Sequence, residues 1–475
     1  MQLKKFFATL SDKHRALQLG NANTNPLTSA FPHKRVVHAG LNGSMVSPAQ
    51  SSVIWQTLLE KTPERLTEQA AYIHIPFCKT KCLYCGFFQN GSKQDVEDAY
   101  IDRLISEMEY EADSPRLKNS IISTVFIGGG TPTSLSPANA KRLLATIKKC
   151  LPLTNDYELT LEGRIHDLIP AKMDVWMAGG VNRISLGVQS FNTKVRQQLG
   201  RLDDEATIIN RLQALHDYHQ CAVIVDLIYG LPDQDMTIWE HDLELFCNSA
   251  IDGADLYQLN VFEGSALNNA IKNGSISKAA TTAKQAEMFA FAHDYLTKRA
   301  LKRLSACHWA KNSRERSLYN IMAKSGAAMF HYGCGAGGFI DGYAAMNHRQ
   351  LTAYNNAIDA GKKPLMMLMK ENPLQKIAQL VLAQLEQGFL NIKTLVNYNP
   401  KLAELEWLYQ TWEKRQLVHF NGYLYELTVP GQFWQVNIAQ STIECCQILL
   451  TGQKFIAICG LVQEEKATKI LYGQE

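Results

Sequence analysis

The chain has 475 residues, of which 46% are hydrophobic and 20% charged, a composition typical of a globular protein large enough for more than one domain. Its net charge of +3, from 48 basic and 45 acidic residues, is too small to indicate a nucleic-acid-binding protein. The N-terminus has no long apolar run typical of a signal peptide, and no stretch reaches the ~18 apolar residues of a membrane span. We therefore expect a cytoplasmic protein with no nucleic-acid partner and no membrane span.

Residues 1–70 lack sustained periodicity and are rich in Asn, Ser, Thr and Pro, which predicts an irregular N-terminal extension with a helix or two. From residue 71, short apolar runs alternate with amphipathic stretches. The runs predict strands at AYIHIP, ISTVFI, YELTLE, VNRISLGV, AVIVDLIYG and DLYQLNVF, and the stretches predict helices at 94–113, 136–150, 170–179, 203–217, 236–248 and 281–299. Six strand-then-helix units over 71–300 predict an α/β fold, a barrel or partial barrel whose strand C-termini carry the chemistry.

Two further segments follow the strand-helix units. Residues 301–364 contain the glycine-rich run HYGCGAGGFIDGY, suited to turns and close backbone approach, which we expect to close the barrel. Residues 365–475 begin with two helical patterns and continue with LVHFNGYLYEL, where Asn421-Gly422 between apolar alternations predicts a β-hairpin. Helices followed by a hairpin indicate a small winged-helix-like α+β C-terminal domain.

The segment CKTKCLYC places Cys78, Cys82 and Cys85 at C-x3-C-x2-C directly after the first predicted strand. In a reducing compartment this spacing indicates metal binding or catalysis rather than disulfides. A [4Fe–4S] cluster has four irons, so three cysteines leave one iron open to an amine and a carboxylate such as those of S-adenosylmethionine, whose reduction gives a carbon radical. A zinc knuckle needs a fourth ligand nearby, which this stretch lacks, and three unrelated cysteines at this spacing are roughly a one-per-cent coincidence.

Candidate ligand contacts follow the later predicted strands. GGGTPT at 128–133 contains three glycines, which let the backbone approach a ligand. Glu162 ends the third strand and could receive a ribose hydroxyl or an ammonium group, although a solvated charge is the more common role of a single Glu. Gln189, Arg201 and Asp226 are likewise expected at or beyond strand ends, and Asp226 interrupts an apolar run, where an unpaired charge is costly. In strand order, these features indicate one ligand cleft.

HIPFCKTKCLYCGF, GGGTPT, the Glu162 strand, NRISLGVQS and DLIYGLP closely resemble the oxygen-independent coproporphyrinogen III oxidase-like branch of the radical S-adenosylmethionine (radical SAM) family. The resemblance runs from about Tyr72 through at least residue 265. It implies a partial (β/α)6 barrel with a [4Fe–4S] cluster and two molecules of S-adenosylmethionine. It implies contacts to the cluster-bound molecule from Tyr72, Gly129 and Glu162. It implies contacts to a second molecule from Tyr84, Gly130, Thr131, Gln189, Arg201 and Asp226.

Within this branch, decarboxylases and haem chaperones usually carry His-Asn-x-x-Tyr-Trp where this chain has Glu315-Arg316-Ser317-Leu318-Tyr319-Asn320. EGRIHDL, HWAKNSRERSLYN, GCGAGGFIDGY and the N-terminal extension are more similar to the haem-utilisation, anaerobilin synthase-like members. That resemblance implies a radical SAM methyltransferase that opens the haem ring anaerobically to a linear tetrapyrrole and releases iron. Its substrate would be haem, and its partner a low-potential electron donor such as flavodoxin or ferredoxin.

Two other functions stay open from the sequence, a haem-binding trafficking protein or chaperone with a [4Fe–4S] cluster and an oxygen-independent coproporphyrinogen III oxidase. Haem contacts are also left open, because histidines and exposed arginines are more often structural or solvated than ligand-binding. The candidate axial ligands are His308, His331, His348 and Cys334, and the candidate propionate partners are Arg314 and Arg316.

Overall fold

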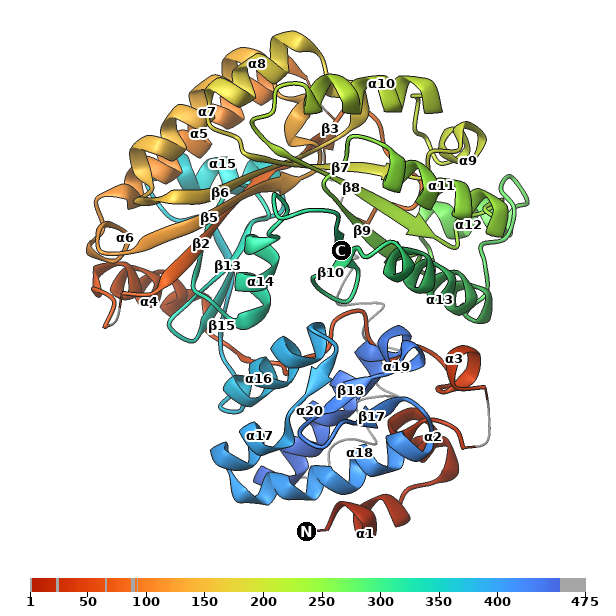
Figure 1. Ribbon diagram of the computed structural model, residues 1–475. Helices are drawn as coiled ribbons and strands as arrows, with labels where there is room; N and C mark the ends of the chain where they lie inside the picture. Colours follow the sequence, from red (N-terminus) through yellow and green to blue (C-terminus); the bar gives the residue numbers. More distant parts are fainter. Residues whose placement is uncertain (1, 23–24, 65, 87–89, 92, 453–475) are drawn as a thin grey trace.

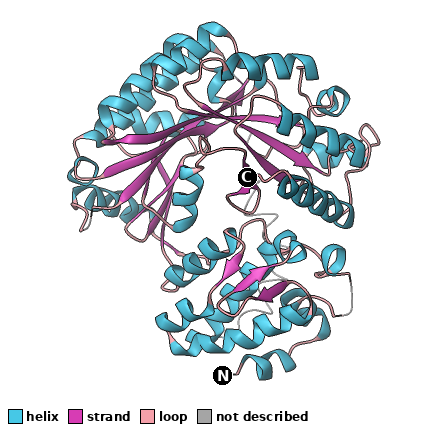
Figure 2. Cartoon of the chain, viewed as in Figure 1, coloured by secondary structure: helices cyan, strands magenta, loops and turns pink. Residues whose placement is uncertain are grey.

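The computed structural model describes residues 2–22, 25–64, 66–86, 90–91 and 93–452, so residues 453–475 of the expected C-terminal domain lie outside the described residues. Figure 1 shows a large curved sheet with helices along its outer side and, below it, a smaller and mostly helical unit. Figure 2 shows the strands of the large sheet fanning across the inner side of this layer of helices. No helix in the described part of the chain has both the length and the apolar character that a membrane crossing requires.

The large sheet has 13 strands in the order β1-β15-β14-β13-β12-β2-β5-β6-β7-β8-β9-β11-β10. The six predicted strands are β2 (Glu68–Ile75), β5 (Ile121–Gly129), β6 (Leu153–Gly163), β7 (Arg183–Gln189), β8 (Ala222–Tyr229) and β9 (Gly253–Gln258). All six pair in parallel, in chain order. The edge strands β1 (Ser44–Met45) and β10 (Lys302–Arg303) lie at opposite ends of the strand order, so the sheet of the described residues is open. The predicted α/β partial barrel is confirmed.

The predicted crossover helices cover the outer side of this sheet (Figure 1). They are α5 (Gln94–Ala112), α7 (Pro137–Cys150), α8 (Pro170–Ala178), α10 (Glu205–His216), α11 (Met236–Asn248) and α13 (Thr282–Lys298). The starts of α7 and α10 are fixed by Ser136 and Asp204, whose side chains accept from backbone amides of the first turn. Shorter helices are α6 (Pro115–Lys118), α9 (Thr193–Gln198), α12 (Ala266–Lys272), α14 (Leu318–Ser325) and α15 (Leu351–Asp359).

The two faces of the parallel sheet differ in polarity. Side chains alternate between faces along a strand, and one set is apolar and buried in the core under the helices. This set includes Ile73, Val125, Leu159, Ile184, Val225 and Ala254. The alternate set faces the inner side and carries most of the polar and titratable side chains of these strands, beside a few apolar ones such as Phe126 and Ile224. It includes Tyr72, Glu158, Glu162, Arg183, Ser185, Asp226 and Asp255. The fold therefore builds its core on one face of the sheet and places charged groups on the other.

The glycine-rich segment adds strands to the sheet. It forms β12 (Met329–Tyr332), β13 (Gly337–Ile340) and β14 (Tyr343–Asn347), and β15 (Leu365–Lys370) continues the sheet past residue 364. Gly338 is needed here because a Cβ would lie 2.5 Å from the carbonyl oxygen of Met329 on the neighbouring strand. At the other edge, β11 (His308–Ala310) pairs antiparallel with β9. These strands widen the barrel on both sides of the six parallel ones.

The smaller unit has the predicted order of helices followed by a hairpin. Its elements are α16 (Gln375–Glu386), β16 (Phe389–Leu390), α17 (Ile392–Tyr398), α18 (Leu405–Lys414), β17 (Val418–Phe420), β18 (Tyr425–Leu427), α19 (Val429–Phe433) and α20 (Gln435–Thr451). Strands β17 and β18 pair antiparallel around Asn421-Gly422, where Gly422 has a φ of +96°. β16 pairs with β18 to complete a three-stranded wing.

The N-terminal extension contains four helices in its described part and contacts both units. They are α1 (Leu3–Ala8), α2 (Asp12–Leu19), α3 (Pro26–Ser29) and α4 (Pro48–Glu60). On the C-terminal unit, Arg35 donates to Glu444 at 2.7 and 2.8 Å. On the barrel, Trp55 of α4 donates to Glu111 of α5 at 2.9 Å. This segment thus has more helix than its composition predicts, and it joins the two units.

Candidate active site

The three cysteines of the C-x3-C-x2-C motif share one site where the chain leaves β2 and β3 (Phe77–Cys78). Cys78 and Cys82 are buried and Cys85 is half-buried. Burial raises the pKa of the Cys78 thiol, Thr131 and Arg164 lower it, and the charges of Cys85 and Cys82 raise it. The Thr131 hydroxyl donates to Cys78 Sγ at 3.4 Å. The cysteines are thus close enough to influence one another's charge, and Thr131 of the glycine loop (residues 128–133) contacts Cys78.

This donor set fits a [4Fe–4S] cluster better than a single ion. The described residues contain no group of three His, Cys, Asp or Glu side chains close enough together to hold one metal ion. A cubane cluster binds each thiolate on a different iron, so its ligands stand further apart than those of one ion. Three thiols for four irons also leave one position for a ligand from outside the protein. We expect Cys78, Cys82 and Cys85 to hold the cluster.

The glycine loop packs directly behind the cluster loop, residues 78–85, which carries the three cysteines. The Gly130 amide donates to the carbonyl oxygen of Ile75 at 2.8 Å, and a Cβ on Gly130 would lie 2.4 Å from the carbonyl oxygen of Phe77. Gly129 has a φ of +119°, and a Cβ there would lie 2.8 Å from the ring of His74. The backbone of this loop therefore approaches the residue before Cys78 more closely than any side chain would allow.

Glu162 and Tyr72 lie on either side of this glycine loop. Glu162 accepts from the Gly129 amide at 3.0 Å. Burial, together with the charge of Asp226, raises the pKa of Glu162 to about 7. The Tyr72 hydroxyl lies 2.9 Å from Nδ1 of His74, and burial and the charge of Glu162 raise its pKa. The three residues expected to contact the cluster-bound molecule, Tyr72, Gly129 and Glu162, are thus neighbours.

The residues expected to contact a second molecule lie beside the cluster loop. Arg201 donates to the Tyr84 hydroxyl at 2.6 and 3.1 Å and to the carbonyl oxygen of Gly187 at 2.9 Å. Gln189 and Arg201 both reach the space beside Gly187, because a Cβ there would lie 2.6 and 3.0 Å from their side-chain nitrogens. Gly187 is the register partner of Asp226 on the next strand. The structure therefore brings Tyr84, Gln189, Arg201 and Asp226 into one region.

Two buried polar atoms of this region, His74 Nε2 and Gln189 Oε1, have no hydrogen-bond partner among the described residues. A buried polar atom without a partner costs about 1–3 kcal/mol, and such atoms are uncommon in folded proteins. Their presence beside two crowded glycines and two half-buried carboxyl groups fits a site for a polar ligand such as S-adenosylmethionine, whose ribose hydroxyls and ammonium group need both donors and acceptors. His74 is a residue of this site that the motif spacing alone did not single out, although it lies on the same face of β2 as Tyr72.

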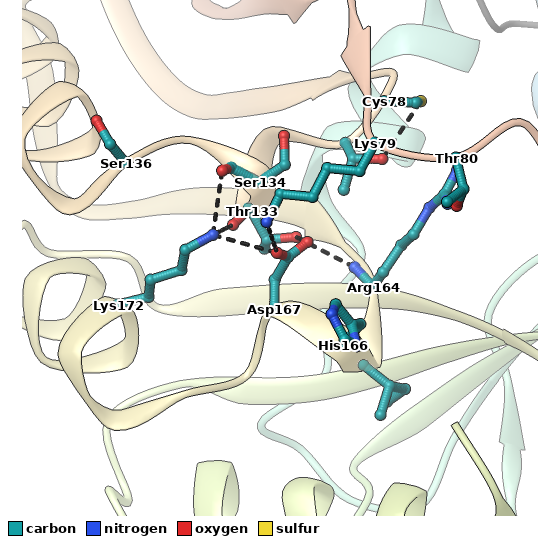
Figure 3. Close-up of polar contacts among 12 residues, drawn as sticks. Cys78, Lys79, Thr80, Thr133, Ser134, Ser136, Arg164, His166, Asp167 and Lys172 are labelled. Atoms are coloured by element: carbon teal, nitrogen blue, oxygen red, sulfur yellow. Dashed lines mark hydrogen bonds and ion pairs between the residues drawn. The ribbon is translucent and has the colours of Figure 1, made fainter. Parts of the chain in front are cut away.

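An ionic network holds the outer side of the cluster loop (Figure 3). Lys172 donates to Asp167 at 3.1 Å and to the carbonyl oxygens of Thr133 and Ser134 at 2.7 and 3.1 Å. Lys79 donates to the same carboxylate at 3.4 Å. The network therefore ties the segment EGRIHDL to both the glycine loop and the cluster loop. A cavity of about 170 Å³ adjoins it. The residues lining this cavity include Lys79, Thr131, Arg164, His166, Arg201 and Asp203.

Three of the four candidate haem ligands are engaged in the protein interior. His308 lies between two carboxylates, with Nδ1 3.0 Å from Asp255 and Nε2 2.9 Å from Glu315. His331 is fully buried with Nε2 3.2 Å from Asn347, and buried Cys334 donates to a backbone carbonyl at 3.3 Å. Only His348 among the four is half-buried. Arg314 and Arg316 are exposed and donate to backbone carbonyls at 2.7 and 3.2 Å.

Known proteins match this chain in sequence and in fold. Residues 72–246 match the Radical SAM superfamily. Anaerobilin synthase from Escherichia coli O157:H7 is 36% identical over 422 residues, which cover 88% of this chain and 93% of that protein. Heme chaperone HemW from Lactococcus lactis is 30% identical over 325 residues, which cover 68% of this chain and 81% of that protein. The solved structure of coproporphyrinogen III oxidase (HemN) from Escherichia coli is 21% identical, covers 84% of this chain and 96% of its own, and has the same fold with a TM-score of 0.72.

An α/β partial barrel, a three-cysteine loop at its strand ends and these similarities all point to one family. The chain belongs to the radical SAM family, in its oxygen-independent coproporphyrinogen III oxidase-like branch, and is a radical SAM enzyme that uses a [4Fe–4S] cluster and S-adenosylmethionine.

Proposed function

We propose that this protein is a cytoplasmic radical SAM methyltransferase that opens the haem ring without oxygen, yielding a methylated linear tetrapyrrole and free iron. The observation that carries this proposal is the extent of the similarity to anaerobilin synthase, 36% identity across 88% of this chain and 93% of that protein. Such coverage includes the units outside the barrel as well as the barrel itself. The match to heme chaperone HemW covers less of each chain, 68% and 81%.

The surroundings of Glu315 support a substrate other than that of the decarboxylases. Glu315 occupies the position where decarboxylases and chaperones usually carry the first histidine of their His-Asn box. Its side chain is 0% exposed, accepts from the guanidinium of Arg183 at 3.0 and 3.2 Å, and lies 2.9 Å from His308. A histidine could not accept two parallel bonds from a guanidinium. Glu315, which stands in place of the first histidine of the box, is thus paired with other charged groups in the interior of this protein.

The proposed reaction needs a radical and a methyl group, and two molecules of S-adenosylmethionine would supply them. When bound, the cluster and these molecules supply one-electron chemistry and a methyl group. For the first molecule we assign Tyr72, Gly129 and Glu162. For the second we assign Tyr84, Gly130, Thr131, Gln189, Arg201 and Asp226. Glu162 and Arg201 are half-buried, and burial is the first cause acting on the pKa of each, which supports a site partly shielded from water, as a reactive radical requires.

The exposed charges of the cluster loop support an acidic electron donor, such as flavodoxin or ferredoxin. Lys79 and Lys81 are the exposed cations between the first two cysteines, whereas the nearby carboxylate of Asp167 is 5% exposed and paired. Lys81→Glu is therefore expected to slow cluster reduction by flavodoxin at low salt and to leave reduction by dithionite unchanged. Lys298→Glu, at an exposed position of α13, is the matched control. Equal flavodoxin rates in both variants would contradict this docking face.

The decisive experiment for the function is an anaerobic reaction followed by mass spectrometry. Reconstituted protein, reductant, S-adenosylmethionine and haem should yield the methylated linear tetrapyrrole and free iron, and Cys82→Ala protein should yield neither. Haem recovered unchanged while 5′-deoxyadenosine accumulates would identify a radical enzyme with another substrate. If neither changes although the cluster is reduced, the trafficking function is favoured, and turnover of coproporphyrinogen III would favour the decarboxylase.

A further inference from the structure

Three titratable side chains lie at one register position on three adjacent strands of the sheet. Asp226 on β8 is the register partner of Asp255 on β9, and Asp255 is the register partner of His308 on β11. Side chains of register partners project from the same face of a sheet and are each other's nearest cross-strand neighbours. The two carboxyl groups and the imidazole therefore lie side by side on the inner face, in a row that leads away from the candidate nucleoside site.

The far end of this row is closed by further charged contacts. His308 Nδ1 lies 3.0 Å from Asp255, and its Nε2 lies 2.9 Å from Glu315, which in turn binds Arg183 at 3.0 Å. The side chains of His308, Glu315 and Asp255 are 1%, 0% and 5% exposed. Cys307 donates to Asp255 at 3.4 Å. These groups are sealed from solvent and lie at ion-pair distance from one another, although neither ring nitrogen of His308 meets hydrogen-bond geometry among the described residues.

The order of charges along the row is set by the position of the imidazole. Burial opposes a charge on His308, but Asp255 and Glu315 on its two nitrogens more than offset burial and raise its pKa to about 9. Burial likewise opposes the charge of Asp255, but the His308 cation and Arg183 hold the pKa of Asp255 below its usual range. Asp226, which is half-buried, then faces the neighbouring negative charge of Asp255. Burial and the charge of Asp255 raise the pKa of Asp226 to about 7.

Other groups around Asp226 oppose or reinforce this effect. Ser185 on β7 donates to Asp226 at 3.3 Å, and the cations of Arg183 and Arg201 lower its pKa. The remaining titratable neighbours are Glu162 on β6 and Tyr257 on β9. Asp226 is thus balanced between two cations and the carboxylates of Asp255 and Glu162.

We propose that half-buried Asp226 and the buried groups Asp255, His308 and Glu315 form a proton-sharing relay in which His308 is the positioning residue. Its cation assigns the negative charge to Asp255 and leaves the shared proton on Asp226, the member of the relay nearest the candidate nucleoside site. Asp226 can then donate a hydrogen bond to a ligand as well as accept one. The consequence for ligand binding rests on the proposed role of Asp226, whereas its protonation is a property of the protein alone.

Infrared difference spectroscopy of the reconstituted, haem-free protein tests the relay directly. Each protonated carboxyl group gives a C=O stretching band, and the band lost in Asp226→Asn belongs to Asp226. We expect that band to titrate with a midpoint near 7 in the wild-type protein. Asp255→Asn removes the neighbouring negative charge and should lower the midpoint by about one unit or more.

The His308→Gln variant separates a relay from a merely structural cluster. Without the His308 cation, the shared proton should move to Asp255. In the His308→Gln background, the protonated-carboxyl band at pH 6 should therefore be lost when Asp255→Asn is added and kept when Asp226→Asn is added. His331→Gln is the matched control, because His331 is an equally buried imidazole that binds Asn347 at 3.2 Å on the other side of the barrel. It should leave the Asp226 band unchanged.

Two results would overturn the relay. The first is an Asp226 midpoint that is unchanged in Asp255→Asn and His308→Gln proteins that still bind iron and unfold cooperatively. The second is the absence of a protonated Asp226 band from the wild-type protein at pH 6, which decides the question even if the variants fail to fold. Haem turnover enters neither measurement, so failure of the relay and failure of the proposed function are distinguishable.

Discussion

A single methyl group at Gly130 should weaken cluster binding. In Gly130→Ala the new Cβ would lie 2.4 Å from the carbonyl oxygen of Phe77 and 2.8 Å from its carbonyl carbon. Both are backbone atoms directly before Cys78, so they cannot move aside as the end of a flexible side chain can. Either the glycine loop or the first cluster ligand must shift to accommodate the methyl group.

The size of the effect follows from the cost of overpacking. Insertion of a methyl group into a well-packed site costs about 1–3 kcal/mol. Total stability is typically about 5–15 kcal/mol, so the variant should still fold. If the strain is relieved only when Cys78 moves out of position, affinity for the cluster falls roughly 5- to 150-fold, since about 1.4 kcal/mol corresponds to a factor of ten.

The assay is the iron and sulfide content of reconstituted protein, with thermal unfolding measured on the same samples. Gly91→Ala is the matched control. Gly91 is the register partner of Cys78 on β4 (Asn90–Gly91), and a Cβ there would meet nothing within 4 Å. Gly130→Ala should lose cluster and Gly91→Ala should retain it. Full iron content in both, with equal unfolding temperatures, would refute the argument from backbone contact.

Three further predictions follow from other contacts. Cys82→Ala should abolish the cluster, as measured by iron analysis, and haem consumption should be lost with it. A full, active cluster in this variant would contradict the assignment of the cluster ligands. The pKa of Glu162 is raised from 4.5 to about 7, so ionisation of Glu162 destabilises the ligand-free protein as pH rises through this window. In urea unfolding, Glu162→Gln should therefore be more stable than wild type at pH 8, by up to roughly 3 kcal/mol, and equal to wild type at pH 4. A difference independent of pH would argue against that burial effect. Arg35→Ala leaves the buried carboxylate of Glu444 without its cation and should cost about 3–5 kcal/mol, whereas Arg15→Ala, in an exposed pair, should cost less than about 0.5 kcal/mol. Equal melting temperatures of these two variants would show that the extension is not anchored through Arg35.

The order of the parallel strands could be predicted from the sequence because its signals are local. Alternating apolar runs and amphipathic stretches report which segments form strands and helices, and six such units in succession permit few arrangements. Strands β11 to β14 escaped prediction because they are only three to five residues long, and β13 begins with two glycines. β11 and β12 join the sheet by pairing with β9 and β2, which lie far away in the chain, so nothing in their own composition marks them.

The sequence by itself predicted the cluster chemistry, because three thiols within eight positions need no distant partner to form one site. It also placed Glu162 at the end of its strand, whereas the expected strand-end position of Asp226 is wrong, because β8 continues to Tyr229. Only the tertiary structure decided which charges compensate one another. Arg183 and Glu315 are 132 positions apart, and their pairing exists only because the strand of one and the loop of the other meet inside the barrel. Short-range spacing fixes which groups are near the metal, whereas the ionisation of a buried group depends on neighbours that only the folded chain brings within a few ångströms.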